Sequence, residues 1–375
     1  MATAAALSSC ALPEAETRAT SQQDRIAFIT HNVATPRDYV VVSMNEDGSD
    51  LVELGPWSYT AHIDFRQCWS LDGKRLVHIG GARADPTRWL SVVDADWGSH
   101  RLMEITDIRG LSISPDGQTV LMARQERRVI EIAHEGHIDL ETEYPTNIIA
   151  VDVESGEMKA LTDFTDIQAE SPVFSPDRKK IAFIGRTDDP QTHFDVYVMN
   201  ADGSGLRRLT HNHGFISFYQ GLQWSPDSRK ILYGLETLML SDIDHYDDIF
   251  VLDVASGQSI NLTNTPEIDD AYFSWSPDGK KIAFMSTREL RPGISDTGVY
   301  VMGAEGENVT EVPALEGRPA WLPDSRTLIA TGRAQDGTLA MVAVDVESGD
   351  FKLLIPYTSI SGNYSGMSDA VWLGN

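Results

Sequence analysis

Short stretches with alternating apolar and polar positions recur along the chain, and the same turn follows each of them. Residues 224–233 (WSPDSRKILY) return as residues 275–284 (WSPDGKKIAF). An apolar strand, a turn rich in Pro and Asp, and a second apolar strand predict a β-hairpin. The repeated phrase therefore predicts an architecture and does not itself indicate a reaction.

The spacing of these hairpins is regular. Their apolar anchor recurs after 44, 61, 50, 51 and 46 residues, at Trp69, Ile113, Phe174, Trp224, Trp275 and Trp321. A second hairpin follows in each unit, with residues 196–210 matched by 42–51 and more loosely by 251–257 and 344–349. Two hairpins per unit at this period are typical of the four-stranded antiparallel blades of a β-propeller. The pattern predicts an all-β protein in which no helix is required.

The two ends of the repeat region complement each other. Residues 369–373 resemble an innermost strand without a partner, and residues 25–28 (RIAF) match 180–183 (KIAF) but lack the strand before them. We expect these fragments to pair and to complete one blade. With the six anchored units this predicts a seven-bladed propeller over residues 24–375, preceded by a disordered tail or lipoprotein-like leader at 1–23.

These phrases resemble the repeats of the TolB-like propeller family over about residues 24 to 375. The resemblance implies a binding scaffold that presents a loop-rich face. The same repeats occur in peptidase-associated propellers and in polysaccharide lyases such as oligogalacturonate lyase, so the resemblance leaves an enzymatic role open. TolB carries an additional N-terminal α/β domain, which we do not expect in this chain.

The net charge of the chain limits the classes of partner that it is expected to bind. Thirty Lys and Arg against 56 Asp and Glu give a net charge of −26. Nucleic acids and anionic membranes bind basic surfaces, so we expect neither as a partner. The acidity indicates a well-solvated surface or, alternatively, affinity for cations and basic groups. No apolar run approaches the ~20 residues of a transmembrane helix, so the sequence predicts no transmembrane segment. We expect the protein to be a monomer.

The two cysteines support neither a disulfide framework nor a zinc–thiolate site. Cys68 lies in a predicted innermost strand and is expected to be an inert core thiol. Residues 7–10 (LSSC) resemble a bacterial lipobox, and a polar tether follows at 13–24. This favours a periplasmic or secreted protein with a lipid anchor at Cys10. A tail without a signal and a cytoplasmic location remain the alternatives, because residues 1–6 lack the basic start and apolar core of a signal peptide.

Long irregular segments gather on one predicted face, opposite the short hairpin turns, at 30–38, 80–88, 124–147, 185–195, 236–248 and 286–298. Loops on a rigid scaffold usually carry function, so we place the site on this face, at the mouth of the central channel. The innermost strands begin there with a polar ring of Arg66, Arg109, Glu170, Gln220, Asp270, Arg318 and Asp369. Its arginines predict binding of an anionic ligand such as a carboxylate. The alternative is an internal network of Arg–acid pairs that plugs the channel.

Histidines supply the remaining candidates. His211 and His213 are spaced as ligands of a divalent metal, the one cofactor we consider, and His62 or Tyr219 are candidate catalytic bases. The alternative is that these are ordinary surface residues. The acidic run 242–248 is a candidate calcium site, because calcium binds carboxylate oxygens. However, Asp248 aligns with Asp195 of the preceding unit and is expected to order the third strand instead.

The sequence contains no Gly-x-Ser-x-Gly elbow, phosphate loop, dinucleotide fingerprint or His-Glu-x-x-His motif. Familiar hydrolase, kinase and dehydrogenase sites are thereby excluded. The first hypothesis is a TolB-like scaffold that binds a protein or glycan. The alternative is a polysaccharide lyase-like or other propeller enzyme acting on an acidic sugar or small anionic substrate.

Overall fold

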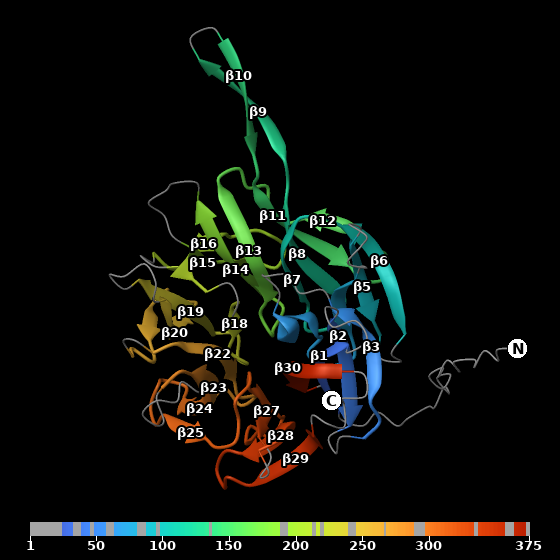
Figure 1. Ribbon diagram of the computed structural model, residues 1–375. Coiled ribbons are helices and arrows are strands. Elements are labelled where there is room, and N and C mark those ends of the chain that lie inside the picture. The colour runs from blue at the N-terminus through green and yellow to red at the C-terminus, as the bar shows by residue number, and fades with distance from the viewer. Residues whose placement is uncertain are drawn as a thin grey trace, which may run out of the picture.

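Strands make up nearly all of the regular structure, and the sheets stand around a common centre (Figure 1). The computed structural model describes residues 25–32, 39–45, 49–57, 64–80, 88–94, 98–134, 137–187, 194–211, 215–217, 221–238, 245–265, 268–288, 297–333, 337–356 and 364–372. Within these ranges the sole helix is a short 3-10 helix, η1 (Phe65–Cys68). No helix in them is long and apolar enough to cross a membrane. The all-β class and the blades of antiparallel strands are confirmed.

The strands nearest the two termini meet in one antiparallel sheet of four strands, in the order β3-β2-β1-β30. β1 pairs with β30 from Ile26 opposite Trp372 to Asn32 opposite Tyr364. Because β30 covers the free edge of β1, this pairing closes the ring. The predicted joining of the C-terminal strand to the N-terminal blade is confirmed. The bounds are β1 (Arg25–Asn32), β2 (Tyr39–Asn45), β3 (Val52–Trp57) and β30 (Tyr364–Trp372).

The next unit departs from the pattern, because η1 takes the place of an innermost strand. β4 (Leu76–Gly80), β5 (Arg88–Val93) and β6 (Ser99–Ile105) form a three-stranded sheet, and an isolated bridge joins Trp69 to Leu76. Asp64 caps η1, since its carboxylate accepts a hydrogen bond from the Arg66 N–H. The expected strand around Cys68 is therefore wrong, because the N-cap aspartate favours a helical turn.

Two units merge into one eight-stranded sheet. The junction is a single parallel pair, Thr146 of β11 opposite Gln168 of β13, whereas the pairs within each unit are antiparallel. The strands are β7 (Ile108–Ile113), β8 (Thr119–Gln125), β11 (Thr146–Asp152), β12 (Met158–Ala160), β13 (Ile167–Phe174), β14 (Lys180–Thr187), β15 (Asp195–Asn200) and β16 (Arg207–Arg208).

Three further sheets complete the ring. The first has five strands, β17 (Phe215–Ile216), β18 (Gln223–Trp224), β19 (Lys230–Leu238), β20 (His245–Asp253) and β21 (Ser259–Asn261). The second has β22 (Asp270–Trp275), β23 (Lys281–Ser286), β24 (Gly298–Gly303) and β25 (Thr310–Val312). The third has β26 (Ala320–Trp321), β27 (Thr327–Arg333), β28 (Leu339–Asp345) and β29 (Phe351–Pro356).

The predicted count of seven blades is not confirmed by this pairing. Within the described ranges, five sheets have four or more strands. The difference has two physical causes: η1 replaces an innermost strand in the second unit, and the pair between Thr146 and Gln168 fuses two units.

One turn recurs at the tip of the first hairpin of successive units. A serine Oγ donates to the aspartate two residues later over 2.6–2.7 Å, at Ser70–Asp72, Ser114–Asp116, Ser175–Asp177, Ser225–Asp227 and Ser276–Asp278. The serine hydrogen bonds hold the pKa of Asp177 and Asp227 below its usual range. Position five of the phrase needs a positive φ, 70° at Gly279 and 63° at Ser228. The repeated Ser-Pro-Asp phrase thus builds the hairpin tips.

A second repeated contact orders the third strand. Thr210 Oγ1 donates to Asp195 over 2.7 Å and Thr263 Oγ1 donates to Asp248 over 3.0 Å. Each threonine oxygen also accepts a hydrogen bond from the backbone N–H that follows its aspartate. Asp248 is therefore a repeat residue equivalent to Asp195, as expected. The rest of the run 242–248 lies partly outside the described residues.

The core lies between facing sheets. Trp224, Trp275 and Trp321 are each at most 7% exposed and pack within separate apolar clusters. Two of these anchors also hold the preceding unit, because Trp224 Nε1 donates to the Val173 carbonyl over 3.3 Å and Trp321 Nε1 donates to the Ser274 carbonyl over 3.0 Å. The anchors therefore join neighbouring units by burial and by hydrogen bonds.

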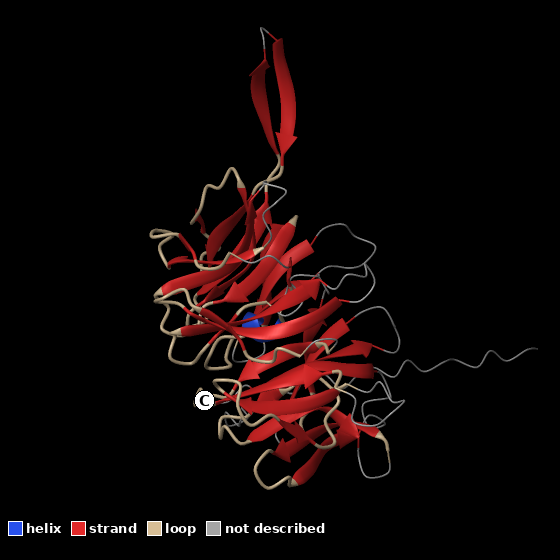
Figure 2. Cartoon of the chain, turned by 90° about the vertical axis from the view of Figure 1, so that its left-hand side faces the viewer, coloured by secondary structure: helices blue, strands red, loops and turns tan. Residues whose placement is uncertain are grey.

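An arm extends outward from the ring (Figures 1 and 2). Its strands β9 (Arg128–His134) and β10 (His137–Glu143) form a separate two-stranded sheet, paired from Arg128 opposite Glu143 to His134 opposite His137. It lies within segment 124–147, which the sequence predicts only as a long irregular loop. That expectation is wrong, because the segment forms a regular hairpin.

Candidate functional site

The 3-10 helix η1 lies at the centre of the ring, where the innermost strands begin (Figure 1). Its side chains reach units that are far away in the sequence. Arg66 Nη1 donates to the Phe273 carbonyl over 2.7 Å, and Gln67 Nε2 donates to the Leu222 carbonyl over 2.7 Å. These hydrogen bonds span 207 and 155 residues of sequence, so η1 bridges distant units.

The guanidinium group of Arg66 binds partners within the protein. Its Nε and Nη2 donate to the two oxygens of Asp64 over 3.1 and 2.8 Å, and Nη1 donates to the carbonyl of Phe273. The side chains of Arg66 and Asp64 are 16% and 9% exposed. A two-pronged ion pair of this kind fixes the guanidinium plane. The local contacts of Arg66 thus follow the alternative in which ring arginines form an internal network.

The position of Gln67 explains why the facing unit has a glycine at position 221. Gly221 has φ of +63°, and a Cβ added there would lie 3.1 Å from Gln67 Nε2. A larger residue would be strained in this left-handed conformation and would crowd the amide. Gly221 therefore lets η1 approach β18.

A buried carboxyl group and two arginines form a second cluster at the start of β7 and β13. Glu170 is 9% exposed, and burial raises its pKa, while the charges of Arg109 and Arg186 oppose that rise. Arg109 Nη2 donates to Gln125 over 3.2 Å, and Arg186 Nη2 donates to Gln168 over 2.9 Å. Burial thus favours the neutral form of Glu170, and the charges of the two arginines favour its ionised form.

Asp270 faces its own sheet. It is fully buried and accepts hydrogen bonds from the hydroxyls of Ser286 and Thr265 and from Arg288 Nη2, the last over 3.1 Å. These three donors occupy much of the hydrogen-bond acceptor capacity of the Asp270 carboxylate. Asp270 is therefore placed as an anchor of β22 to β23.

Arg318 makes a different contact. Its guanidinium carbon lies 4.0 Å from the centre of the Tyr272 ring, a cation–π geometry. Tyr272 itself has φ of +54°, an uncommon value for a residue with a side chain. The strained tyrosine at the bulge of β22 thus supports the arginine that precedes β26.

Several predicted site residues fall outside what the structure describes. These are His62, His213, Tyr219 and Gln220. Asp369 lies in β30, but its side chain is not described. His211 is exposed on the described chain. No group of three or more His, Cys, Asp or Glu residues able to hold a metal occurs within the described ranges. The metal and base assignments therefore stay predictions.

Cys68 behaves as expected for a core thiol. It is fully buried and free, and burial raises its pKa well above the usual value, with a further rise from the charge of Asp64. A thiol held protonated is unreactive. Cys10 lies outside the described residues.

The sequence alone did not indicate Asp64, Gln67, Arg186 or Tyr272. Asp64 offered a signal, because an aspartate two residues before Arg66 at a unit boundary is typical of a helix N-cap. The others become visible only when distant units are brought together. Among the described residues, the predicted ring is thus divided into four local groups, around Arg66, Glu170, Asp270 and Tyr272.

Comparison with known proteins supports the fold. No family model matches the chain. An uncharacterised peptidase of Bacillus subtilis is 27% identical over 119 residues, which cover 31% of this chain and 17% of that protein. An uncharacterised protein of Agrobacterium fabrum is 30% identical over 164 residues, covering 40% of this chain and 50% of that protein. The matches thus span no more than half of either relative's length.

Three solved structures share the architecture. TolB from Acinetobacter baumannii superposes with a TM-score of 0.52 at 17% identity, over 94% of this chain and 67% of that one. Oligogalacturonate lyase from Vibrio parahaemolyticus gives 0.58 at 14%, over 90% and 87%. The propeller domain of the Trilobed protease from Pyrococcus furiosus, which has an open velcro topology, gives 0.58 at 13%, over 89% and 95%. The chain has a TolB-like β-propeller fold.

Proposed function

We propose that this protein is a binding scaffold whose loop-rich face and projecting arm hold another protein. The observation that carries the proposal is the β9–β10 hairpin, which stands clear of the ring and pairs with no other strand among the described residues (Figure 2). An isolated two-stranded hairpin is at best marginally stable in water, so a partner that covers it gains contact area at little cost. The structural likeness to TolB agrees with this role.

The chemistry of the arm favours a basic partner. β10 carries Asp139, Glu141 and Glu143, and the whole chain has a net charge of −26. Complementary charge steers association and selects partners. We therefore propose a protein with a basic, extended segment as the partner and place glycan binding second.

The experiment compares the full chain with a variant in which residues 128–143 are replaced by a short Gly-Asn-Gly turn. Proteins retained by each are identified after mild crosslinking in cells and then tested for direct binding as purified proteins. We expect the variant to keep its melting temperature and lose a partner that binds the full chain directly. Equal direct binding of every partner by both proteins would contradict the role of the arm.

The seven-bladed count is part of this proposal. The eight-stranded sheet splits at the lone Thr146–Gln168 pair into two units, and the first strand of each ends at a predicted anchor, Ile113 or Phe174. Counting η1 with β4 to β6 as one unit then yields seven. An experimental structure in which these units share one continuous antiparallel sheet would contradict this count.

A second candidate function is a lyase acting on an acidic sugar. The cluster of Glu170, Arg109 and Arg186 supports it. β-Elimination needs a cation beside the carboxylate of the sugar and a base that removes the proton next to that carboxylate. An oligogalacturonate lyase with bound manganese shares the fold, with a TM-score of 0.59 at 14% identity. In this proposal His211 and His213 hold a divalent metal and His62 or Tyr219 is the base.

The lyase proposal is tested with a panel of oligouronates and Mn²⁺, monitored by ultraviolet absorbance of the unsaturated product. Glu170→Gln should abolish product formation if this carboxyl group acts, and His213→Ala should do so only if a metal is held there. Absence of product from every uronate would leave the scaffold as the function.

We also propose export to the periplasm or medium with lipid attachment at Cys10. Cell fractionation tests this, with Cys10→Ala as the comparison. The full chain should sediment with membranes and the variant should not. Recovery of both in the cytoplasmic fraction would contradict export.

A further inference from the structure

We propose that a second copy of this chain pairs with the free edge of β9, so that two arms form one antiparallel sheet in the order β10-β9-β9-β10. Among the described strands, β9 and β10 pair only with each other. Each strand of the arm therefore has one edge that no described strand covers. The basic partner proposed above belongs to the acidic strand β10, whereas the second copy takes β9, so the two interactions are independent.

The uncovered edge of β9 is regular. Its register with β10 runs without a shift from Arg128 opposite Glu143 to His134 opposite His137. In an antiparallel pair, alternate residues exchange hydrogen bonds with the partner strand, so the residues between them turn their N–H and C=O groups away from it. Such an edge is a template on which another extended strand can pair.

The composition of β9 is that of a central strand. Its middle runs from Val129 to Ala133 and contains three β-branched residues, Val129, Ile130 and Ile132, and one charged residue, Glu131. Val129 is 56% exposed in the single chain. β-Branched residues favour sheets, and their contacts across strands stabilise the sheet. The sequence of β9 therefore favours cover by a further strand.

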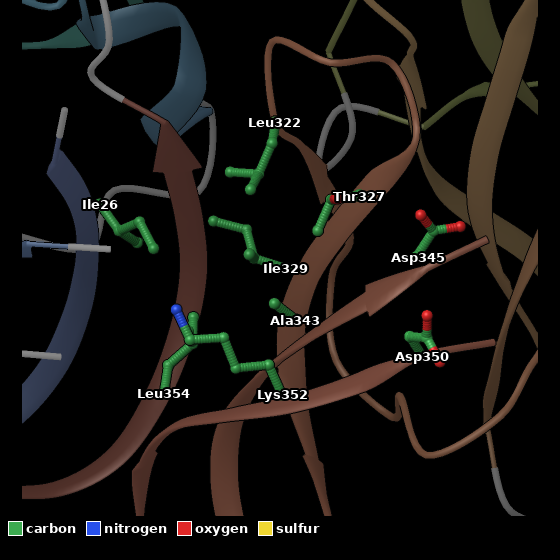
Figure 3. A pocket seen from close by; sticks show the side chains of 9 residues that line it. All are labelled: Ile26, Leu322, Thr327, Ile329, Ala343, Asp345, Asp350, Lys352 and Leu354. Atoms are coloured by element: carbon green, nitrogen blue, oxygen red, sulfur yellow. The ribbon is translucent and has the colours of Figure 1, made fainter. Parts of the chain in front are cut away.

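The outer strands of the ring, in contrast, carry features that oppose pairing with another chain. β12, β16, β21 and β25 are two or three residues long, and β6 has a register shift. β3 contains Pro56, and β29 carries Lys352 and ends at Pro356. Figure 3 shows Lys352 and Leu354 of β29 among the residues that line a pocket with Ile26. Short strands, bulges, proline and lysine protect a sheet edge, and β9 has none of these features.

Charge distinguishes the two edges of the arm. When a twofold axis relates two antiparallel strands, the numbers of opposite residues have an even sum, because hydrogen-bonded and non-hydrogen-bonded pairs alternate. The acidic residues of β10 are Asp139, Glu141 and Glu143, all at odd positions. Two β10 strands that overlap about any residue from 139 to 143 would place carboxylates opposite carboxylates, which is destabilising. The β10 edge therefore does not accept a second copy.

Charge also selects the register at β9. With Ile132 at the twofold axis, Ile130 lies opposite His134 of the second copy, and Glu131 lies opposite Ala133. With Glu131 at the axis, two glutamates would lie opposite each other. With Ile130 at the axis, the tip of each arm would come nearer to the other ring, and two chains of net charge −26 repel each other. We therefore assign Ile132 to the axis.

The ring holds the base of the arm and presents its edges. The Glu126 N–H donates to the Pro145 carbonyl over 2.9 Å, and Arg128 Nη2 pairs with Asp163 over 2.6 Å. Figures 1 and 2 show the arm extending beyond the ring, so two arms can lie side by side while the rings stay apart. A strand that is already extended loses less freedom on pairing, which favours association.

The first experiment measures the mass of the purified full chain by sedimentation equilibrium over a range of concentrations. We expect a dimer whose fraction rises with concentration. Ile132→Lys, which places two ammonium groups at the axis, should weaken dimerisation at least about tenfold. Leu140→Lys makes the same change in β10 and is the matched control, with a dissociation constant within about twofold of the unchanged chain. A monomer at every concentration up to about 100 µM, or equal weakening by both variants, would overturn the proposal.

A disulfide experiment keeps the proposal testable if Ile132→Lys disrupts the arm itself. Opposite residues of an antiparallel pair have Cα atoms roughly 4.5–5.5 Å apart, within reach of a disulfide. In a Cys10→Ala background, Ile132→Cys should therefore form a crosslinked dimer on mild oxidation, and Leu140→Cys should not. Cys68 is buried and stays unreactive. No crosslinked dimer from Ile132→Cys, or equal crosslinking of both variants, would overturn the proposal.

Salt separates this dimer from the basic partner proposed above. Dimerisation should strengthen as the salt concentration rises, since screening weakens the repulsion between two chains of net charge −26. Binding of a basic partner should weaken over the same range. Dimerisation that weakens with salt would indicate charge pairing and would overturn pairing through β9. Loss of the basic partner from a chain that still dimerises would contradict only the function proposed above.

Discussion

At the scale of single residues, the centre of the ring is built from charged side chains that find partners within the protein. Asp64 and Arg66 form a mostly buried pair, and Asp270 is held by two hydroxyls and Arg288. Burying such groups costs free energy unless each is paired, so every member depends on its partner. Arg318 lies in addition against the face of an aromatic ring, that of Tyr272.

The buried ion pair leads to a prediction for Arg66. Arg66→Ala should lower the free energy of unfolding by about 3 kcal/mol, since it leaves Asp64 unpaired and removes the bond to Phe273. Denaturant unfolding at neutral pH measures the loss. A loss below about 1 kcal/mol, the size expected of an exposed ion pair, would contradict an internal role for Arg66.

At the scale of elements, each first hairpin is held by its own serine and aspartate. Ser225 is 4% exposed, donates to Asp227 over 2.6 Å and accepts from the Lys230 N–H over 2.8 Å. The same set of bonds recurs at Ser175 and Ser276. Because the bonds are local, each hairpin tip forms independently of the ring, whereas the sheets gain stability from packing against their neighbours.

The turns make stability depend on acid pH. The pKa values of Asp177 and Asp227 are lowered chiefly by the serine hydrogen bonds, so their stabilisation is complete above the unfolded pKa near ~4 and is lost as the pH falls through the folded values. We expect the melting temperature to fall steadily below about pH 4. A melting temperature that rises on acidification through this window would contradict the assignment.

A single turn can be tested in the same way. Ser225→Ala should cost about 1–3 kcal/mol at neutral pH, because it removes the buried Ser225 hydroxyl and leaves the partly buried Lys230 N–H without its acceptor. Ser155→Ala is the matched control, since Ser155 also donates to an aspartate, Asp152, but is exposed. The control should lose less than Ser225→Ala in denaturant unfolding. A larger loss from the control would contradict the importance of burial.

At the scale of the whole molecule, one strand pair closes the ring. β30 covers the edge of β1, and Ile26 and Phe28 of β1 pack against the last unit. The closing sheet is thus assembled from segments more than three hundred residues apart in sequence. Contacts of this length link the stability of all units to one another.

Removing residues 368–375 should therefore destabilise the whole protein. The deletion takes away the partners of Ile26, Ala27 and Ile29, opening the edge of β1. We expect a loss of at least about 1–3 kcal/mol, because backbone groups of β1 lose their hydrogen-bond partners and Val371, which packs against the core, is removed as well. Deleting residues 1–22 is the control and should leave the melting temperature unchanged. Equal melting temperatures for the full chain and the 368–375 deletion would contradict closure by β30.

The sequence by itself determined the parts of this protein that rest on local chemistry. The Ser-Pro-Asp phrase predicts each hairpin tip, and the match of residues 25–28 to 180–183 predicts the partner of β30, because strand pairing follows the apolar pattern and the turn residues. The alignment of the repeats likewise predicts that Asp195 and Asp248 are equivalent.

Only the tertiary structure decided which side chains meet at the centre and between the last unit and the closing sheet. Arg66 lies 207 residues from Phe273, and Ile26 lies far from Ala343, so no local pattern records either contact. The sequence identifies Arg66, Glu170 and Arg318 as ring members but not their partners. Burial and the approach of distant units determine whether a charged group is paired and whether its pKa is shifted. Both outcomes depend on packing of the whole ring.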